Sequence, residues 1–475
     1  ASGEQVFFGL VGTNTVDETD KIAFFHPSRE RFIEYDLTRL VYELSNPQRP
    51  KVGVMTGLPV NGEMRGPMGR PTPPWAVMTQ MRQFLSVQDV PLDAAEIAPD
   101  IGVLMVAHPQ NLPEKTQYAI DQFVMRGGKL MLLVDPHSEA QAARPGPGGV
   151  PNRDTASDLP RLLEAWGIAY DKDKVAGDLR GAMRVRAGER DRVQAVDYVA
   201  WFTASGPDQI SRDNPATGRL NQVTVASAGF LAKRDGSAIE FEPLVTTSPE
   251  AAPIEAAKVR TEPNPTQILA EFRPGNAKLV LAARIRGEVA SAFPDGPPAP
   301  PEGEQAPERK EPHRARSEGP ANIVVIADSD ILEDRFWVRV QDFFGQQVVT
   351  PFADNGALVI NLLDTLSGSD ALIGLRSRGE SRRPFELVDE MRRRAEAEFR
   401  AREQALQKRL EETEAKLREL RRGTGEAGRA DPVLTPEQRA AIEEARADIL
   451  ETRRELRAVQ RDLRREIEGL QTTLR

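Results

Sequence analysis

The sequence predicts an α/β protein with a parallel sheet, a β-rich insertion and a C-terminal antiparallel helical hairpin. Near-continuous apolar strands alternate with helices between residues 51 and 134, which is typical of a parallel sheet covered on both faces. A fourth strand of the same kind appears only at 322–327, after a long stretch rich in β-like runs. Apolar residues then recur every seven positions through 381–475, which indicates a coiled coil.

The first part of the chain is divided by turn and cap residues. Asn46-Pro47 ends one helix and Gly127-Gly128 ends another. The expected elements, in order, are a hairpin of 4–12 and 21–26, a helix at 30–45, a strand at 51–56, a helix at 74–85, a strand at 101–106, a helix at 112–125 and a strand at 129–134.

The long stretch before residue 322 predicts an insertion followed by a loop. Short β-like runs occur at 196–202, 222–226, 240–246 and 278–286. Residues 293–320 are rich in Pro, Glu and Arg with little apolar content, which predicts a disordered loop. The expected domains are an α/β core in two parts (1–170 and 321–380), a β-rich insertion (171–292), the loop (293–320) and the hairpin (381–475).

The two arms of the predicted hairpin are defined by their heptads and by the break between them. Glycines at 423–428 end the first arm, and Thr435 with Pro436 begins the second as N-cap and first helical residue. The seam residues are Phe399, Leu406, Leu410, Thr413, Leu417 and Leu420 on one arm and Ile442, Ile449, Leu456, Leu463 and Leu470 on the other. We expect this hairpin to act as a spacer or grip, because it carries no chemistry.

Composition excludes several classes of function. The net charge is -9 and aromatic residues make up 6% of the chain, so a nucleic-acid-binding platform is not expected. With no cysteine, the chain has no thiolate nucleophile, disulfide or zinc–thiolate site, and it fits an oxidising compartment. No apolar run approaches the roughly 20 residues that a membrane helix needs.

Polar residues follow the expected parallel strands, where ligands bind in open α/β sheets. The candidate ligand-binding residues are Thr56, Gly57, His108, Asp135, His137, Asp328 and Asp330. Histidine nitrogens and carboxylates can hold a metal or act in hydrolysis. The alternative is structural, because aspartate after a strand caps helices and stabilises turns. The structural reading is preferred, and we expect no catalytic residue, no metal and no cofactor.

Several blocks of the sequence occur in an order that resembles a known family. These blocks are 52–56, 112–136, 323–330, 355–361 and 372–379, with the opening 3–9 and the segment 34–38 also fitting. Their succession is similar to the GldG-like family of ABC-transporter auxiliary proteins, which is linked with gliding-motility transporters. The resemblance implies a flavodoxin- or amidotransferase-like core. Amidotransferase chemistry needs a cysteine nucleophile, which this chain lacks.

The resemblance also implies a location and partners. It predicts a non-enzymatic auxiliary subunit on the periplasmic face of the bacterial inner membrane, working with an ABC permease and ATPase. It further predicts two membrane helices outside residues 1–475 that would anchor the protein: one, with a small domain, before the chain, and one shortly after Arg475. Two alternatives remain: a ligand-binding module, with a small molecule or glycan in the strand-end cleft, and a hydrolase using His108, His137 and the strand-end carboxylates.

Overall fold

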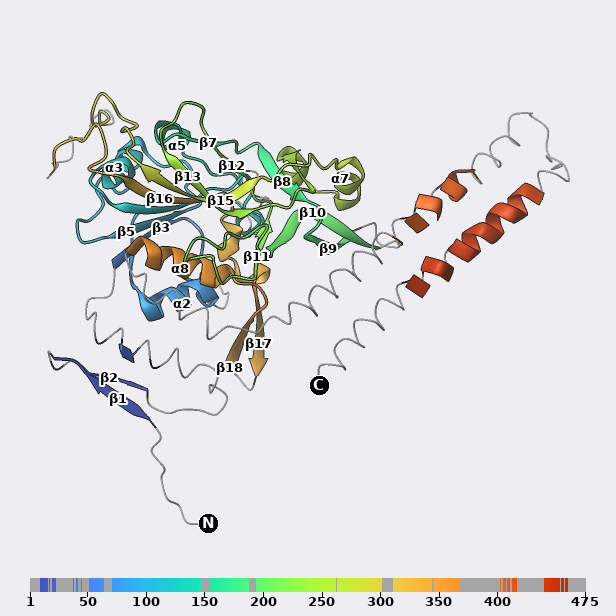
Figure 1. Cartoon of the computed structure of the whole chain (residues 1–475), viewed down its shortest axis with the longest axis horizontal. Coiled ribbons are helices and arrows are strands. Elements are labelled where there is room, and N and C mark those ends of the chain that lie inside the picture. The colour runs from blue at the N-terminus through green and yellow to red at the C-terminus, as the bar shows by residue number, and fades with distance from the viewer. Residues whose placement is uncertain are drawn as a thin grey trace, which may run out of the picture. The chain divides into compact units, whose positions relative to one another are not determined.

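The computed structural model describes residues 9–22, 51–63, 71–300 and 311–367, with parts of 37–44, 402–416 and 440–459 (Figure 1). Residues left out within these ranges are 16, 18, 38–39, 42–43, 145, 147–149, 151, 153, 188–193, 262, 344–345, 403–404, 407, 411, 453 and 457. The chain forms two compact units, 1–380 and 381–475, and each is described by itself.

A nine-stranded mixed sheet forms the centre of the first unit (Figure 1). Its parallel half consists, in spatial order, of β4 (Ser86–Asp89), β3 (Lys51–Thr56), β5 (Val103–Ala107), β6 (Lys129–Leu133) and β16 (Ala321–Ile326). The order continues, antiparallel, through β15 (Val280–Gly287), β12 (Leu231–Lys233) and β7 (Ile168–Tyr170), and β13 (Glu240–Thr246) also pairs with β15.

The strand predicted at 322–327 does return to the sheet beside the strand predicted at 129–134. Ile323 lies opposite Leu130 and Ile326 opposite Leu133, in parallel register. The central sheet is parallel from β4 to β16, as predicted, and the inserted segment extends it on the other side of β16 with antiparallel strands. An antiparallel neighbour needs no covering crossover helix, so short alternating runs can extend the sheet.

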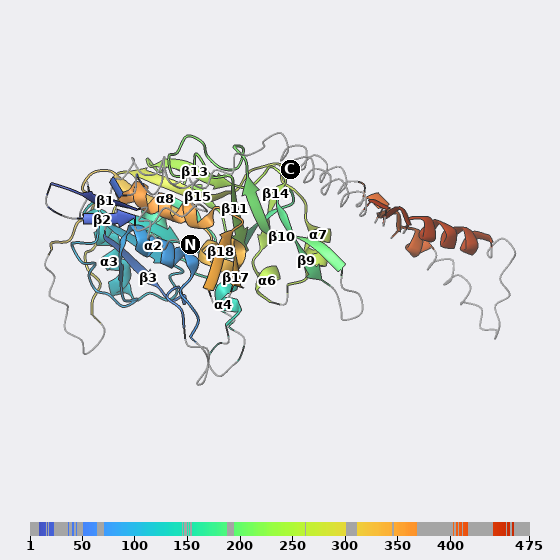
Figure 2. The ribbon, with the colours of Figure 1, turned by 90° about the horizontal axis from the view of Figure 1, so that it is seen from below.

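Helices cover both faces of the parallel half because successive side chains of each strand point to opposite faces. Val54 and Met105 face a core shared with α2 (Ala76–Phe84) and α8 (Asn355–Ser367). Met55 and Leu104 face a second core shared with α3 (Glu114–Met125) and α5 (Pro160–Ala165). Figures 1 and 2 both show α2 beside α8. The predicted helices at 74–85 and 112–125 are therefore confirmed, with slightly shorter bounds.

The inserted segment also builds two small sheets beside the central one. One contains β9 (Ala182–Ala187), β10 (Gln194–Ser205) and β11 (Gln222–Ala226), and the other pairs β8 (Lys174–Asp178) with β14 (Ala251–Glu255). The four predicted β-like runs are confirmed as β10, β11, β13 and β15. Two short helices, α6 (Ala257–Arg260) and α7 (Pro265–Glu271), follow β14. The proposed domain boundaries stay predictions.

The remaining elements of the first unit are short. They are the hairpins β1 (Leu10–Thr13) with β2 (Thr19–Ile22) and β17 (Val338–Phe343) with β18 (Gln346–Pro351), the helix α4 (Glu139–Ala142), and the 3-10 helices η3 (Asp330–Leu332) and η4 (Asp334–Phe336). An N-terminal hairpin was predicted, and it lies within 10–22. Most of the helix predicted at 30–45 lies outside the described residues.

The predicted disordered loop needs correction at both of its ends. Phe293 is buried, with 2% of its surface exposed. Residues 311–318 lie along α3: Arg314 N–H donates to the Gln122 side chain at 2.7 Å, and Glu318 N–H donates to the Met125 carbonyl at 2.7 Å. The charged composition of this segment predicted disorder, but residues 314 and 318 are held by hydrogen bonds to polar groups of α3 and not by burial in a core. Residues 301–310 lie outside the described part.

The second unit contains helical residues within 402–416 and 440–459. Arg409 forms an ion pair with Asp448, and the Thr413 hydroxyl donates to the same carboxylate at 3.1 Å. Ala445, Ile449 and Thr452 are buried at helical spacing. The predicted turn at 423–434 and seam residues Phe399, Leu417, Leu420, Leu463 and Leu470 lie outside the described residues. Among the helices that the structure describes, none has both the length and the apolar character required to cross a membrane.

Candidate functional site

Three aspartates meet at the carboxyl ends of two neighbouring parallel strands. Asp135 follows β6, while Asp328 and Asp330 follow β16. One carboxylate oxygen of each lies within 4.8 Å of the others, and all three side chains are buried. The structure therefore brings together three of the seven candidate residues, as expected for strand ends at one edge of a sheet.

Asp135 joins the ends of β6 and β16. Its Oδ2 accepts hydrogen bonds from the Ser329 N–H at 2.8 Å and from the Ser329 hydroxyl at 2.6 Å. Its Oδ1 accepts one from the His137 N–H at 2.8 Å, which fixes the loop after β6. Both oxygens are thus used to hold backbone in place.

Asp328 and Asp330 tie further segments to the same point. Asp328 accepts the N–H of Ala226 at 2.9 Å, which fastens β11 to the central sheet, and the N–H of Asp330 at 2.7 Å. Asp330 accepts the N–H groups of Glu139 at 2.6 Å and Ala140 at 2.9 Å. These two N–H groups open α4 and have no partner within the helix, so Asp330 caps that helix from a distant part of the chain.

Burial and mutual repulsion raise the pKa of all three carboxyls. Burial is the larger cause in each case, and the second is a neighbouring charge: Asp328 acts on Asp135, Asp330 on Asp328, and Asp135 on Asp330. Three charges this close in a buried site do not ionise together. A cation would have to compete for oxygens that already accept backbone hydrogen bonds, so the geometry favours the structural reading of these aspartates.

The two candidate histidines flank the aspartates and are both buried. His108 has a φ of 53°, and its Nε2 lies 2.8 Å from the Gln141 side-chain oxygen. Burial lowers its pKa. His137 Nδ1 lies 2.7 Å from the Thr155 hydroxyl, and burial lowers its pKa as well, although the charge of Glu139 opposes that shift. Both rings are therefore mainly neutral near pH 7.

Thr56 is the last residue of β3 and Gly57 follows it, and the neighbours of both are apolar or backbone groups. The Thr56 hydroxyl accepts the Leu58 N–H at 3.1 Å, and a Cβ on Gly57 would meet Leu92 at 3.6 Å. Among the described residues, neither hydrogen bonds to the aspartates at the ends of β6 and β16. Their assignment to a ligand site stays a prediction.

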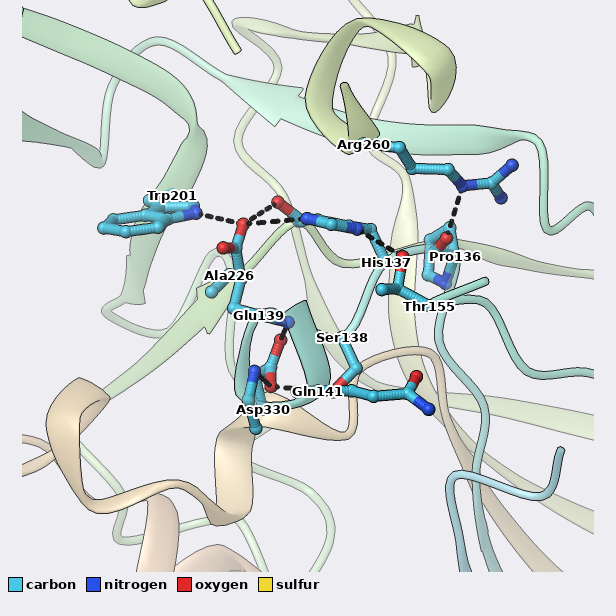
Figure 3. Close-up of polar contacts among 12 residues, drawn as sticks. Pro136, His137, Ser138, Glu139, Gln141, Thr155, Trp201, Ala226, Arg260 and Asp330 are labelled. Carbon is cyan, nitrogen blue, oxygen red and sulfur yellow. Dashed lines mark hydrogen bonds and ion pairs between the residues drawn. The ribbon is translucent and has the colours of Figure 1, made fainter. Parts of the chain in front are cut away.

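Sequence reasoning missed Glu139, which lies among the side chains drawn in Figure 3. Its Oε1 accepts the Trp201 indole N–H at 2.8 Å and the Ser227 hydroxyl at 2.7 Å, and His137 Nε2 lies 3.8 Å away. In the sequence, Ser138 has the character of a helix N-cap and Glu139 that of an acidic residue in the first helical turn, so neither indicates a tertiary contact. Trp201 belongs to β10 and Ser227 directly follows β11, and no spacing in the sequence connects either residue to Glu139.

The fold and this edge define a class of protein: a mixed α/β domain in which an inserted β-sheet is fastened to the strand ends by buried carboxylates. A family model described as "ABC-type uncharacterized transport system" matches residues 49–362. The chain belongs to this family of transport-system auxiliary proteins. The comparison with curated proteins found no match, and neither did the comparison with solved structures.

Proposed function

We propose that the protein is a non-enzymatic auxiliary subunit of an ABC transport system, of the GldG-like type. The observation that carries the proposal is the family match, which extends from β3 into α8 and so includes both parts of the sheet and the insertion. The non-enzymatic assignment is supported by the strand-end carboxylates, whose oxygens are used to hold backbone segments together.

The proposal places the chain on the periplasmic face of the inner membrane, anchored by helices outside residues 1–475. Its support is the ordered set of blocks that resembles the GldG-like family and a composition without cysteine, which fits an oxidising compartment. A permease and an ATPase are the expected partners, since an auxiliary subunit acts through them.

The C-terminal unit is proposed as the arm that couples the α/β unit to the permease. Its support is the pair of contacts from Arg409 and Thr413 to Asp448, together with the buried residues Ala445 and Ile449. These contacts join the two predicted arms. Such a paired, charge-rich unit can transmit force or set spacing without a ligand site.

The location can be tested with a single introduced cysteine, because residues 1–475 contain none. Glu412 is exposed in the C-terminal unit, and Glu412→Cys in the full-length protein offers a labelling site. We expect a membrane-impermeant maleimide to label this variant in spheroplasts as fully as in detergent. Labelling only after detergent would contradict the periplasmic assignment, and the protein without the substitution is the control for background.

The partners can be tested by affinity purification of the full-length protein from solubilised membranes. We expect one permease and one ATPase to copurify in fixed proportion. The Leu410→Asp, Leu456→Asp double variant should lose them while residues 51–367 stay folded. Purification without either component, or unchanged copurification with the double variant, would count against the coupling role.

A further inference from the structure

A chain of polar side chains at the end of β5 fixes the hydrogen of the His108 ring. The side-chain nitrogen of Gln110 donates to the carbonyls of Asp154 at 3.1 Å and Ala156 at 2.8 Å. A carbonyl only accepts, so the Gln110 side-chain oxygen points the other way and accepts from the side-chain nitrogen of Gln141. The Gln141 oxygen therefore faces His108 Nε2 at 2.8 Å, and this ring nitrogen carries the hydrogen.

The other ring nitrogen of His108 is consequently a buried acceptor without a donor. The residue is 3% exposed, and Nδ1 has no hydrogen-bond partner among the described residues. The His108 N–H donates to the Leu133 carbonyl at 2.9 Å, which holds the backbone at the end of β5. Buried polar atoms are nearly always paired, so an unpaired one needs an explanation. Nδ1 is also the atom that gains a proton when this neutral ring becomes charged.

The same contacts hold a segment of the chain against the strand ends. We call it the α4 segment, and it consists of residues 138–144 and 154–157. The Ser138 N–H donates to the Thr155 carbonyl at 2.8 Å, and the Thr155 hydroxyl lies 2.7 Å from His137 Nδ1 (Figure 3). Gln110 holds the carbonyls on both sides of Thr155. The position of the α4 segment therefore depends on the chain of contacts that ends at His108.

The charged groups around His108 make a second proton on its ring unfavourable. Burial lowers the pKa of His108 and the neighbouring His137 adds to that shift, while the hydrogen bond at Nε2 and the charge of Asp154 oppose it. Burial and Arg260 lower the pKa of His137 in turn, against the charge of Glu139. A proton on His108 Nδ1 would therefore place a charge in the interior without a hydrogen-bonded partner.

The stability of the α4 segment should consequently depend on pH. Since the folded pKa of His108 lies below the ordinary value of 6.5, the closed segment binds fewer protons than an opened one, and its stability falls as the pH drops below that value. The buried Asp135, Asp328 and Asp330 act in the opposite direction, because their pKa values are raised. Opening of the segment in acid would therefore not originate from these aspartates.

We propose that His108 is a proton-sensitive latch that holds the α4 segment closed. A proton on Nδ1 finds no acceptor, so the charged ring moves toward solvent and its contact with Gln141 breaks. Residues 154–157 and α4 then lose a common tie to the strand ends. Glu139, which lies in α4, loses its fixed position beside Trp201, so acid would also loosen the inserted sheet. This latch requires no assumption about a transport system.

Hydrogen–deuterium exchange of the 1–475 chain at about pH 7.5 and about pH 5 tests the latch, because these values lie on either side of the histidine range. Labelling times are scaled so that an unprotected amide exchanges equally at both values. We expect the amides of 138–144 to exchange about tenfold faster in acid, since one proton taken up shifts an opening equilibrium by up to about tenfold per pH unit. The amides of α3 should not change. Unaltered protection of 138–144 in acid would overturn the proposal.

Two variants assign the acid response to His108. Glutamine at this position keeps a side-chain N–H for Gln141 and cannot be protonated near neutral pH, so His108→Gln should abolish the acceleration. His313→Gln, in the segment that contacts Tyr118 of α3, removes a different histidine and should retain it. An equal acid response in a folded His108→Gln protein would assign the effect to another group and refute the latch.

NMR of the histidine ring nitrogens tests the same proposal without a substitution. We expect His108 in the Nε2–H form at neutral pH, with Nδ1 taking up a proton over the pH range in which 138–144 becomes exposed to exchange. A ring with its hydrogen on Nδ1 at neutral pH, or one that takes up its proton without faster exchange, would contradict the latch even if His108→Gln did not fold.

Discussion

Asp135 and Ser329 lie 194 positions apart in the sequence, and two hydrogen bonds join them. The carboxylate accepts both the N–H and the hydroxyl of Ser329, at 2.8 and 2.6 Å. Asp135 follows β6 and Ser329 follows β16, so this contact joins the ends of two paired strands that the inserted segment separates in the sequence. The strand-end aspartates therefore have a structural role: they hold distant parts of the chain together through hydrogen bonds.

Removing one of these buried aspartate side chains should lower the free energy of unfolding. Asp330→Ala leaves the N–H groups of Glu139 and Ala140 without their acceptor in a buried setting. We expect a loss of about 2–4 kcal/mol in the free energy of unfolding, since an unsatisfied buried donor costs about 1–3 kcal/mol. Urea denaturation measures this loss. Asp235→Ala, at an exposed position, is the control and should change the free energy of unfolding by less than about 0.5 kcal/mol. Equal effects of the two variants would contradict the capping role.

The raised pKa of Asp328 predicts a definite pH dependence. Above the ordinary pKa of 3.8 the unfolded chain loses this proton while the folded chain keeps it, so the folded state binds more protons and stability falls as pH rises. Asp328→Asn cannot ionise. The stability of the unsubstituted protein relative to Asp328→Asn should therefore decrease from pH 4.5 upward, by at most about 1.4 kcal/mol per pH unit. Urea titrations at three pH values measure the difference; a constant or growing advantage for aspartate would disprove the raised pKa.

Metal removal should leave stability unchanged. The oxygens of Asp135, Asp328 and Asp330 already accept hydrogen bonds from the protein, and an ion would have to displace those donors. We expect EDTA to shift the melting temperature by less than about 1 °C, because nothing that stabilises the fold would be withdrawn. Tight zinc or manganese binding that disappears in His108→Ala or His137→Ala would refute this and revive the hydrolase alternative.

The loop 293–320 should divide into two parts of unequal importance. Replacing 302–309 by a short Gly-Ser linker should change the melting temperature little, since loop closure depends only weakly on length. Replacing 311–318 should lower it by several degrees, because Arg314 and Glu318 bond to α3 and Tyr118 stacks on His313. Differential scanning calorimetry compares the two replacements. An equally small effect of both would show that the contacts along α3 do not matter.

The C-terminal unit should depend on apolar contacts between its two helical segments. Leu410 and Leu456 are half-buried seam residues of the two helical segments, and the double Leu→Asp variant places one charge on each segment. We expect helicity at 222 nm to fall while the cooperative melting of residues 51–367 stays in place, since short isolated helices are only marginally stable. A matched Leu450→Asp variant, at a 56% exposed position, should change little. Loss of both transitions in the double variant would contradict the independence of the two units.

Much of the fold could be predicted because its signals are local. Apolar runs such as 129–134 and 322–327, bounded by glycines or aspartates, predicted the parallel half and its pairing. The antiparallel half was less visible, because a strand such as β15 looks the same in the sequence whether it joins the central sheet or a separate one. The segment 311–318 was misjudged for a related reason: its polar residues bond to α3, and composition does not reveal partners.

The sequence by itself determined the α/β class, the positions of most strands and helices, and the gathering of Asp135, Asp328 and Asp330 at one edge, because periodicity and strand order depend on local side-chain patterns. Only the tertiary structure decided what those aspartates bond to, and that Glu139 meets Trp201 and Ser227 from the insertion. Hydrogen bonds between residues far apart in the sequence depend on how the chain packs, and the local sequence around each residue does not reveal that packing.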